Sequence, residues 1–292
     1  MWTYLNSDHL YSEAGIRLCC FVGVLVTMAG WEFLAPRRGL STSKLLRWTS
    51  HFGLSVINVV ALRLLIPLGA IGVALAAEAH RWGLFYHFSL PDWLACLICL
   101  LALDFAIYLQ HRLFHAVPVL WRLHMVHHAD LDFDVTTGLR FHTIEILLSF
   151  GMKCVSIVLL GALPVAVLVF EVMLNATAMF NHSNIRLPLA LDRLLRTIVV
   201  TPDMHRVHHS AIKREANSNF GFNLPWWDFL LGTYRGQPDG GHERMMIGLS
   251  QFRDDRVERL PQMLALPFTD KVESNSIKQD NGEPESQSSS PR

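Results

Sequence analysis

Long apolar runs separated by short polar stretches make up most of the first two thirds of the chain. Three of them, residues 14–34, 52–77 and 93–109, approach the roughly 20 residues that a helix needs to cross a bilayer core of about 30 Å. A fourth stretch, residues 144–172, is interrupted at Gly161-Ala-Leu-Pro164 and predicts a helical hairpin, spanning or re-entrant. We therefore expect an all-α integral membrane protein with about four to five transmembrane or hairpin helices.

Basic residues give the expected orientation of these helices. Arg37, Arg38, Lys44 and Arg47 follow the first run, and the positive-inside rule places such a cluster in the cytoplasm. Successive spans then return the chain to the cytoplasmic side after the third run and again after the hairpin. Arg63 lies inside the second run, where it either reaches the interface or faces the protein interior.

The composition agrees with a membrane protein and excludes other classes. Of the 292 residues, 51% are hydrophobic and 17% are charged, whereas soluble domains carry about 25% charged residues. The formal net charge of +0 gives no support for a nucleic-acid partner. All five cysteines lie in apolar segments, which favours small buried residues over a disulfide framework.

Polar residues become more frequent toward the end of the chain. Residues 201–234 are polar and contain proline and glycine breakers, which predicts a cytoplasmic helical cap. Beyond Phe268 almost no apolar residues remain, which is typical of disorder. We divide the chain into N-terminal membrane helices at residues 1–92, a catalytic domain at 93–250 and a disordered polar tail at 269–292.

Three histidine clusters carry the most informative chemistry, with the sequences HRLFH, HMVHH and HRVHH. Histidines at positions i, i+3 and i+4 of a helix share one face, so each cluster can present its imidazoles in one direction. Eight imidazoles exceed the three or four protein ligands of one zinc site, so the count predicts two metal ions held close together. The predicted ligands are His111, His115, His124, His127, His128, His205, His208 and His209. A metal pair beside a membrane indicates oxidation of a lipid-like substrate.

Other classes of metal protein fit the clusters less well. A zinc protease helix has a glutamate after its first histidine, where Arg112 stands here. A histidine-rich metal transporter, or a metal-binding protein without oxidase activity, predicts ligands along a pathway inside the spans. Here the clusters lie at or beyond span ends, although this alternative stays open. A lipid-binding remnant and a zinc-dependent membrane hydrolase are further alternatives; the intact histidines and the absence of a glutamate in the clusters count against them.

Residues beside the clusters are candidates for supporting roles. His182 and His142 flank the predicted hairpin, and either could be a ninth ligand. Carboxylates near the clusters could orient the imidazoles by hydrogen bonding. They are Asp104, Asp130, Asp132, Asp203 and Asp228.

The order of the three clusters, together with the surrounding text TPDMHRVHHS and NSNFGFNLPWWDFLLGTY, resembles the fatty acid hydroxylase superfamily, which includes the sterol desaturases. The resemblance covers residues 104–234, and the whole sequence is most similar to bacterial members described as sterol desaturase family proteins. It makes residues 93–250 a fatty acid hydroxylase/sterol desaturase-like domain. It implies transmembrane helices capped by a cytoplasmic domain that holds a di-metal centre, and the bacterial inner membrane as its location.

The resemblance also implies an activity and its cofactors. It implies O2-dependent oxidation of a lipid C–H bond at two Fe ions, by hydroxylation or desaturation, with hydroxylation favoured by the breadth of family chemistry. The eight cluster histidines become iron ligands, and His182 joins them because family members often place a histidine there. No cytochrome b5-like domain is recognisable in the sequence, so we expect a separate electron donor, either a ferredoxin, a cytochrome b5-like protein or a reductase. Phe150, Phe170 and Phe180 are expected to line the lipid slot.

Overall fold

The computed structural model describes residues 7–269, and these residues form helices and loops with no strand among them. Five stretches are long and apolar enough to cross a membrane: Glu13–Leu34, Lys44–His87, Asp92–Ala116, Thr143–Leu160 and Pro164–Asn181. The long helices are α1 (Ser7–Leu34), α2 (Lys44–Leu65), α4 (Asp92–Ala116), α6 (Thr143–Leu160) and α7 (Pro164–Asn181). The expected all-α membrane fold is confirmed, whereas the predicted tail lies outside the described residues except for Thr269.

The single helix expected at residues 52–77 is wrong. The chain instead forms α2 and a separate helix α3 (Gly69–His80). Pro67 has no N–H to donate, and proline restricts Ile66 before it to non-helical angles, so helix α2 ends at Leu65. Helix α2 also begins eight residues earlier than expected, because Ser43 caps it by accepting a hydrogen bond from the Leu46 N–H at 3.3 Å. Arg63 is exposed on α2.

The predicted hairpin is confirmed as α6 and α7. Gly161 ends α6 in the left-handed conformation at φ 68°, and Pro164 occupies the first turn of α7. The N–H groups of Gly161 and Ala162 both donate to the carbonyl of Ile157, which satisfies that end of α6. A Cβ atom on Gly83 would lie 2.1 Å from the Gly161 nitrogen, so the loop before α4 and the hairpin turn need glycine to pack this closely.

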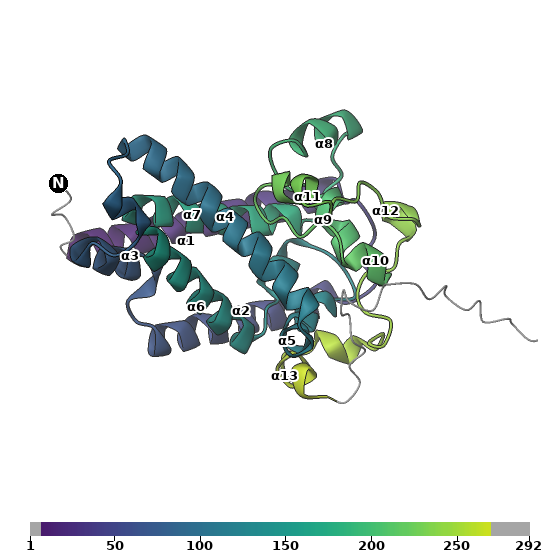
Figure 1. The fold of residues 1–292 in the computed structure, drawn as a ribbon. Helices are drawn as coiled ribbons and strands as arrows, with labels where there is room; N and C mark the ends of the chain where they lie inside the picture. Colours follow the sequence, from purple (N-terminus) through teal and green to yellow (C-terminus); the bar gives the residue numbers. More distant parts are fainter. Residues whose placement is uncertain (1–6, 270–292) are drawn as a thin grey trace, which may run out of the picture.

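Helix α7 occupies the centre of the bundle, where it contacts α1, α3 and α4. Short helices gather at one end of the bundle, and α3 lies at the opposite end (Figure 1). The short helices are α5 (Pro118–His128), α8 (Leu189–Leu195), α9 (Pro202–His208), α10 (Lys213–Ala216), α11 (Trp226–Leu230), α12 (Gly241–Arg244) and α13 (Leu260–Ala265). Four 3-10 turns complete the described chain: η1 (Leu84–His87), η2 (Val135–Leu139), η3 (Asp255–Glu258) and η4 (Leu266–Phe268). Large apolar side chains such as Val56, Val60 and Leu159 are exposed on the long helices, as expected of a surface that faces lipid.

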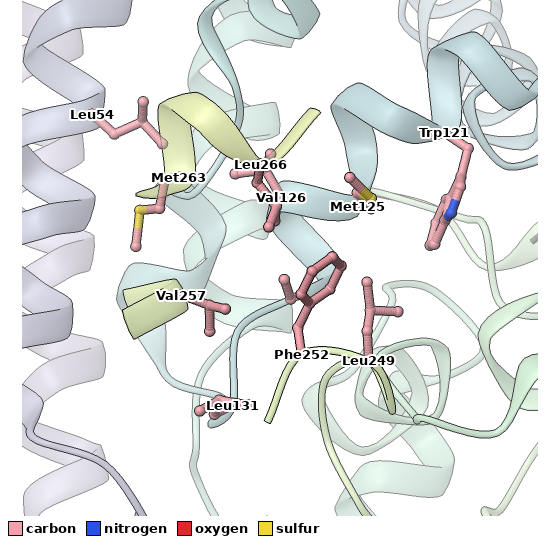
Figure 2. Packing of buried hydrophobic residues seen from close by; sticks show 11 residues of the cluster. Leu54, Trp121, Met125, Val126, Leu131, Leu249, Phe252, Val257, Met263 and Leu266 are labelled. Atoms are coloured by element: carbon pink, nitrogen blue, oxygen red, sulfur yellow. The ribbon is translucent and has the colours of Figure 1, made fainter. Parts of the chain in front are cut away.

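A buried apolar cluster attaches the segment at residues 249–266 to the bundle. Trp121 and Met125 of α5 belong to one cluster with Leu54 of α2 and Met263 of α13, and all four side chains are almost fully buried (Figure 2). Removing this much apolar surface from water stabilises the contact by about 1.5–3 kcal/mol per large side chain. Helix α5, which carries the second histidine cluster, is therefore held between α2 and the C-terminal segment.

A buried ionic network lies directly behind α5. Arg47 of α2 donates to both oxygens of Asp130 at 2.8 Å and also pairs with Asp134, while Arg140 pairs with Glu258. Burial alone would raise the pKa of Asp130, but the neighbouring guanidinium groups of Arg47 and Arg140 lower it well below its usual range. The negative charge of Asp130 is therefore stabilised inside the protein, where two arginines oppose the three carboxylates of the network.

Candidate metal centre

Four separate segments bring nine histidines into one buried chamber. Helix α4 carries His111 and His115 in its last two turns, and α5 begins at Pro118 directly after it, which turns the chain so that the second cluster faces the first. His182 ends α7, and the third cluster lies on α9 and its C-terminal cap. None of the nine side chains is more than 7% exposed.

The nine imidazoles form two groups, and in each group one ring nitrogen per histidine lies within 4.8 Å of the others. The first group contains His111, His115, His124, His128 and His208. The second group contains His127, His182, His205 and His209. The structure therefore places every histidine predicted as a ligand in one of two adjacent groups of four or five nitrogen donors.

Hydrogen bonds to the outer nitrogens orient the first group. His111 Nδ1 lies 2.9 Å from the carbonyl oxygen of Phe220, and His208 Nδ1 lies 2.8 Å from that of Ser218. A carbonyl oxygen only accepts, so both Nδ1 atoms carry the proton and both Nε2 atoms keep a lone pair. These Nε2 atoms are buried and have no hydrogen-bond partner among the described residues. A metal ion between the rings would use these lone pairs.

Glu145 of α6 orients the His124 ring in the same way, with a carboxylate as the hydrogen-bond acceptor. Its Oε1 lies 2.6 Å from His124 Nδ1, and His124 Nε2 is buried without a hydrogen-bond partner. A carboxylate behind a metal-binding imidazole fixes the ring and makes its other nitrogen more basic. The sequence analysis missed Glu145, because 21 positions separate it from His124 and no spacing rule connects residues on two different helices.

The second group is held partly by its own members. His182 Nδ1 lies 2.7 Å from the Ala178 carbonyl oxygen, and its Nε2 lies 3.1 Å from His127 Nε2 and 3.0 Å from His205 Nε2. Both ring nitrogens of His209 are buried without a hydrogen-bond partner in the part of the chain that the structure describes. Unpaired buried nitrogens are costly, and a bound metal ion is the partner that removes this cost.

Burial keeps these imidazoles neutral. Burial lowers the pKa values of His127, His205, His208 and His209 well below the usual range, and neighbouring imidazoles lower them further. Burial also lowers the pKa of His182 to about 4. Neutral imidazole is the form that binds metal, so the donor set fits iron, copper, zinc or nickel.

His142 belongs to neither group. Its Nδ1 caps α6 by accepting from the Ile144 N–H at 3.2 Å, and its Nε2 lies 3.3 Å from the carbonyl oxygen of Leu264. It is therefore a helix cap that contacts the C-terminal segment.

Of the five carboxylates considered for orienting the imidazoles, two hold the loop that contacts His111 and three bond elsewhere. Asp228 accepts from the N–H groups of Phe220 and Gly221 at 2.8 and 2.7 Å, which fixes the loop whose Phe220 carbonyl holds His111. Asp104 accepts from Trp227 Nε1 at 2.7 Å and holds the same loop to α4. The other three bond to Arg47, Ser41 and Arg206, so within residues 7–269 none of the five hydrogen-bonds to a chamber imidazole.

A cavity of about 340 Å³ leads to the chamber from between the long helices. It is lined by His111 and His124 of the first group and by His127 of the second group. Its walls include Phe114, Leu139, Phe141, Phe150 and Leu174, as well as polar side chains such as Gln110 and Glu145. The expected lining by Phe170 and Phe180 is wrong: Phe170 is buried in the core between α3, α4, α6 and α7, and Phe180 packs beside Met179 against α1.

The fold and the chamber define a helical membrane protein whose buried polyhistidine centre opens into a largely apolar cavity. Residues 96–233 match the family described as fatty acid hydroxylase, so for this region the resemblance that the histidine clusters predicted is confirmed. No solved structure matches the chain.

Curated relatives include several proteins named as lipid hydroxylases or monooxygenases. The ornithine lipid hydroxylase of Rhizobium tropici is 35% identical over 173 residues, which cover 56% of this chain and 48% of that protein. The human alkylglycerol monooxygenase is 26% identical over 61% of this chain and 38% of its own length. The human cholesterol 25-hydroxylase is 32% identical over 48% of this chain and 50% of its own length. The chain thus spans about half, or less, of the length of these relatives.

Proposed function

We propose that the protein is an O2-dependent di-iron oxidoreductase that hydroxylates a C–H bond of a membrane lipid. One observation carries the proposal: the cavity between the membrane helices ends on imidazoles of both histidine groups. A lipid chain in this cavity would place a carbon beside both ions, as a two-metal oxidation requires. The names of the relatives support a lipid substrate and favour hydroxylation over desaturation.

The nine histidines would hold the two ions, five around one ion and four around the other. Iron, when bound, supplies the activation of O2 that a saturated C–H bond requires. One oxygen atom enters the lipid and the other leaves as water, so each turnover consumes two electrons and two protons from a separate donor. Phe114, Phe141 and Phe222 surround the mouth of the chamber, where they would exclude bulk water and position the chain.

The arrangement does not favour the alternative of a metal transporter. A transport pathway would distribute its ligands along the spans, whereas here the imidazoles share one buried chamber at the end of α4, α7 and α9. We propose that this end faces the cytoplasm of a bacterial inner membrane, where a ferredoxin, a cytochrome b5-like protein or a reductase delivers the electrons.

Growth under heavy-isotope O2 tests this function. A strain with the intact gene should contain a lipid that carries one heavy oxygen atom, and a strain with His208→Ala should lack it, by comparative lipid mass spectrometry. His87→Ala is the matched control, because His87 is exposed and lies far from the chamber in the sequence. A lipid that only loses two hydrogens would make the protein a desaturase. Identical lipids in both strains would exclude lipid oxidation.

Replacing Glu145 tests whether its carboxylate raises the affinity of the chamber for iron. Glu145→Gln removes the negative charge behind His124, and we expect iron affinity to fall about tenfold to a hundredfold, while saturating iron still restores two ions per chain. Iron titration of the purified protein measures both quantities. Glu243→Gln is the control, because this carboxylate is 62% exposed on α12. Unchanged affinity in the Glu145 variant would show that its carboxylate has no influence on the ions.

A further inference from the structure

The end of the cavity away from the histidines is charged. Arg17, Lys153 and Glu171, which come from α1, α6 and α7, all line it. Lys153 pairs with Glu171, and Arg17 Nη1 lies 2.8 Å from Glu171 Oε2. The side chains of Lys153 and Glu171 are only 12% and 4% exposed, so they interact inside the protein.

The depth of these charges is unusual for a structural ion pair. Lys153 lies well inside α6 and Glu171 near the middle of α7, both of which are candidate membrane spans. Charged groups are expensive at this depth, and in membrane proteins they mark sites that bind substrates or ions. Two apolar helices each carry one such charge, and both charges face the same cavity.

The cluster carries an excess of positive charge. Arg17 and Lys153 oppose the single carboxylate of Glu171; at its edge Glu13 pairs with Arg17 at 3.0 Å, and Arg63 acts electrostatically on Glu171. One positive charge is left over whether the first three residues are counted alone or together with Glu13 and Arg63. An unbalanced charge in a low-dielectric site is stabilised by a ligand of opposite sign.

The spacing along α6 relates the cluster to the histidine chamber. Glu145 and Lys153 both line the cavity and are eight residues apart, which corresponds to about 12 Å along a helix. Ile146 and Phe150 lie between them, and the lining includes Ile107 and Leu174 from the facing helices. The cavity therefore has a histidine end, a mainly apolar middle in which Ser149 accepts a hydrogen bond from Gln110, and a cationic end.

We propose that the Arg17–Lys153–Glu171 cluster binds the anionic group of an amphiphilic substrate. The apolar chain then extends toward the chamber, and the length of the cavity determines how far from the anion a carbon is oxidised. The oxidation step rests on the proposed function, whereas the binding step does not. Carboxylates and phosphates both carry the negative charge that the cluster would bind.

Binding under anaerobic conditions tests the cluster without any oxidation. The full-length protein in dodecyl maltoside would be titrated with radiolabelled palmitate, hexadecyl phosphate and methyl palmitate, which share a chain and differ in charge. We expect either or both anions to bind about tenfold more tightly than the neutral ester, and Lys153→Met to remove this preference. The more tightly bound anion distinguishes a carboxylate from a phosphate ligand.

A second variant separates binding from folding. Lys153→Met leaves Glu171 paired with Arg17, whereas Glu171→Gln removes the negative charge and should strengthen anion binding or leave it unchanged. A purely structural ion pair would instead make both variants bind all three probes less well. Lys213→Met, on α10, is the control and should bind as the intact protein does. Equal affinity of the intact protein for palmitate, hexadecyl phosphate and methyl palmitate would overturn the proposal, even if the lipid oxidation itself is confirmed.

Discussion

Replacing both His205 and His209 by alanine is expected to lower the iron bound per chain from two ions to one and to abolish lipid oxidation. The two residues supply half of the second group, and the remaining pair, His127 and His182, offers too few donors to hold an ion firmly. Among the described residues the imidazole of His209 makes no hydrogen bond, and His205 Nε2 bonds only to His182, so the substitution breaks little else. The first group keeps all five of its imidazoles.

Elemental analysis of the protein after anaerobic reconstitution with iron measures the stoichiometry. The matched control replaces His80 and His87, which are both exposed and lie outside the two groups, and it should still bind two ions. Two ions per chain in the His205/His209 variant would show that the second group is not a metal site. Retained oxidation with a single ion would refute a two-metal mechanism.

Arg47→Met is expected to lower the free energy of unfolding by about 3–5 kcal/mol, which is a large part of the total stability of a typical protein. Arg47 is fully buried and contacts Asp130, Asp134 and Thr137. Without its guanidinium, two buried carboxylates face each other with less compensation. Asp130 directly follows α5 and its Ala129 cap, so the loss would also loosen the second histidine cluster.

Thermal unfolding of the detergent-solubilised protein measures this loss. Lys44→Met provides the control, because Lys44 is exposed one turn earlier on α2 and its cation–π contact with Trp48 is worth little at the surface. The melting temperature of Arg47→Met should lie well below that of Lys44→Met. Similar melting temperatures would show that the network contributes no net stability.

The membrane helices could be predicted from apolar run length, because bilayer thickness dictates it. The break at Pro67 could have been predicted as well, since proline signals a helix end even inside an apolar run. The start of α2 was harder, because Lys44 and Arg47 appear polar and loop-like. Arg47 in fact faces inward to Asp130, a partner 83 positions away that only the folded chain brings near.

The candidate site was predictable where its chemistry is local. Histidine spacing on single helices identified the eight cluster residues, and family resemblance added His182, which the structure places in the second group. Glu145, the carbonyls of Phe220 and Ser218, and the charged end of the cavity come from contacts between distant segments. Phe170 was misplaced because an aromatic residue on an apolar helix has no pattern that separates core from cavity lining.

The carbonyls of Ser218 and Phe220 bear on how the protein is made. The Ser218 carbonyl orients His208, and the Phe220 carbonyl orients His111, which lies 109 positions before Phe220 in the chain. While a ribosome is still synthesising residues before 218, Glu145 is already available to orient His124, but the carbonyl that fixes the proton of His111 on Nδ1 has not yet been made. We therefore expect the first histidine group to reach its full metal affinity only after the loop at residues 218–220 has been made and has folded over it.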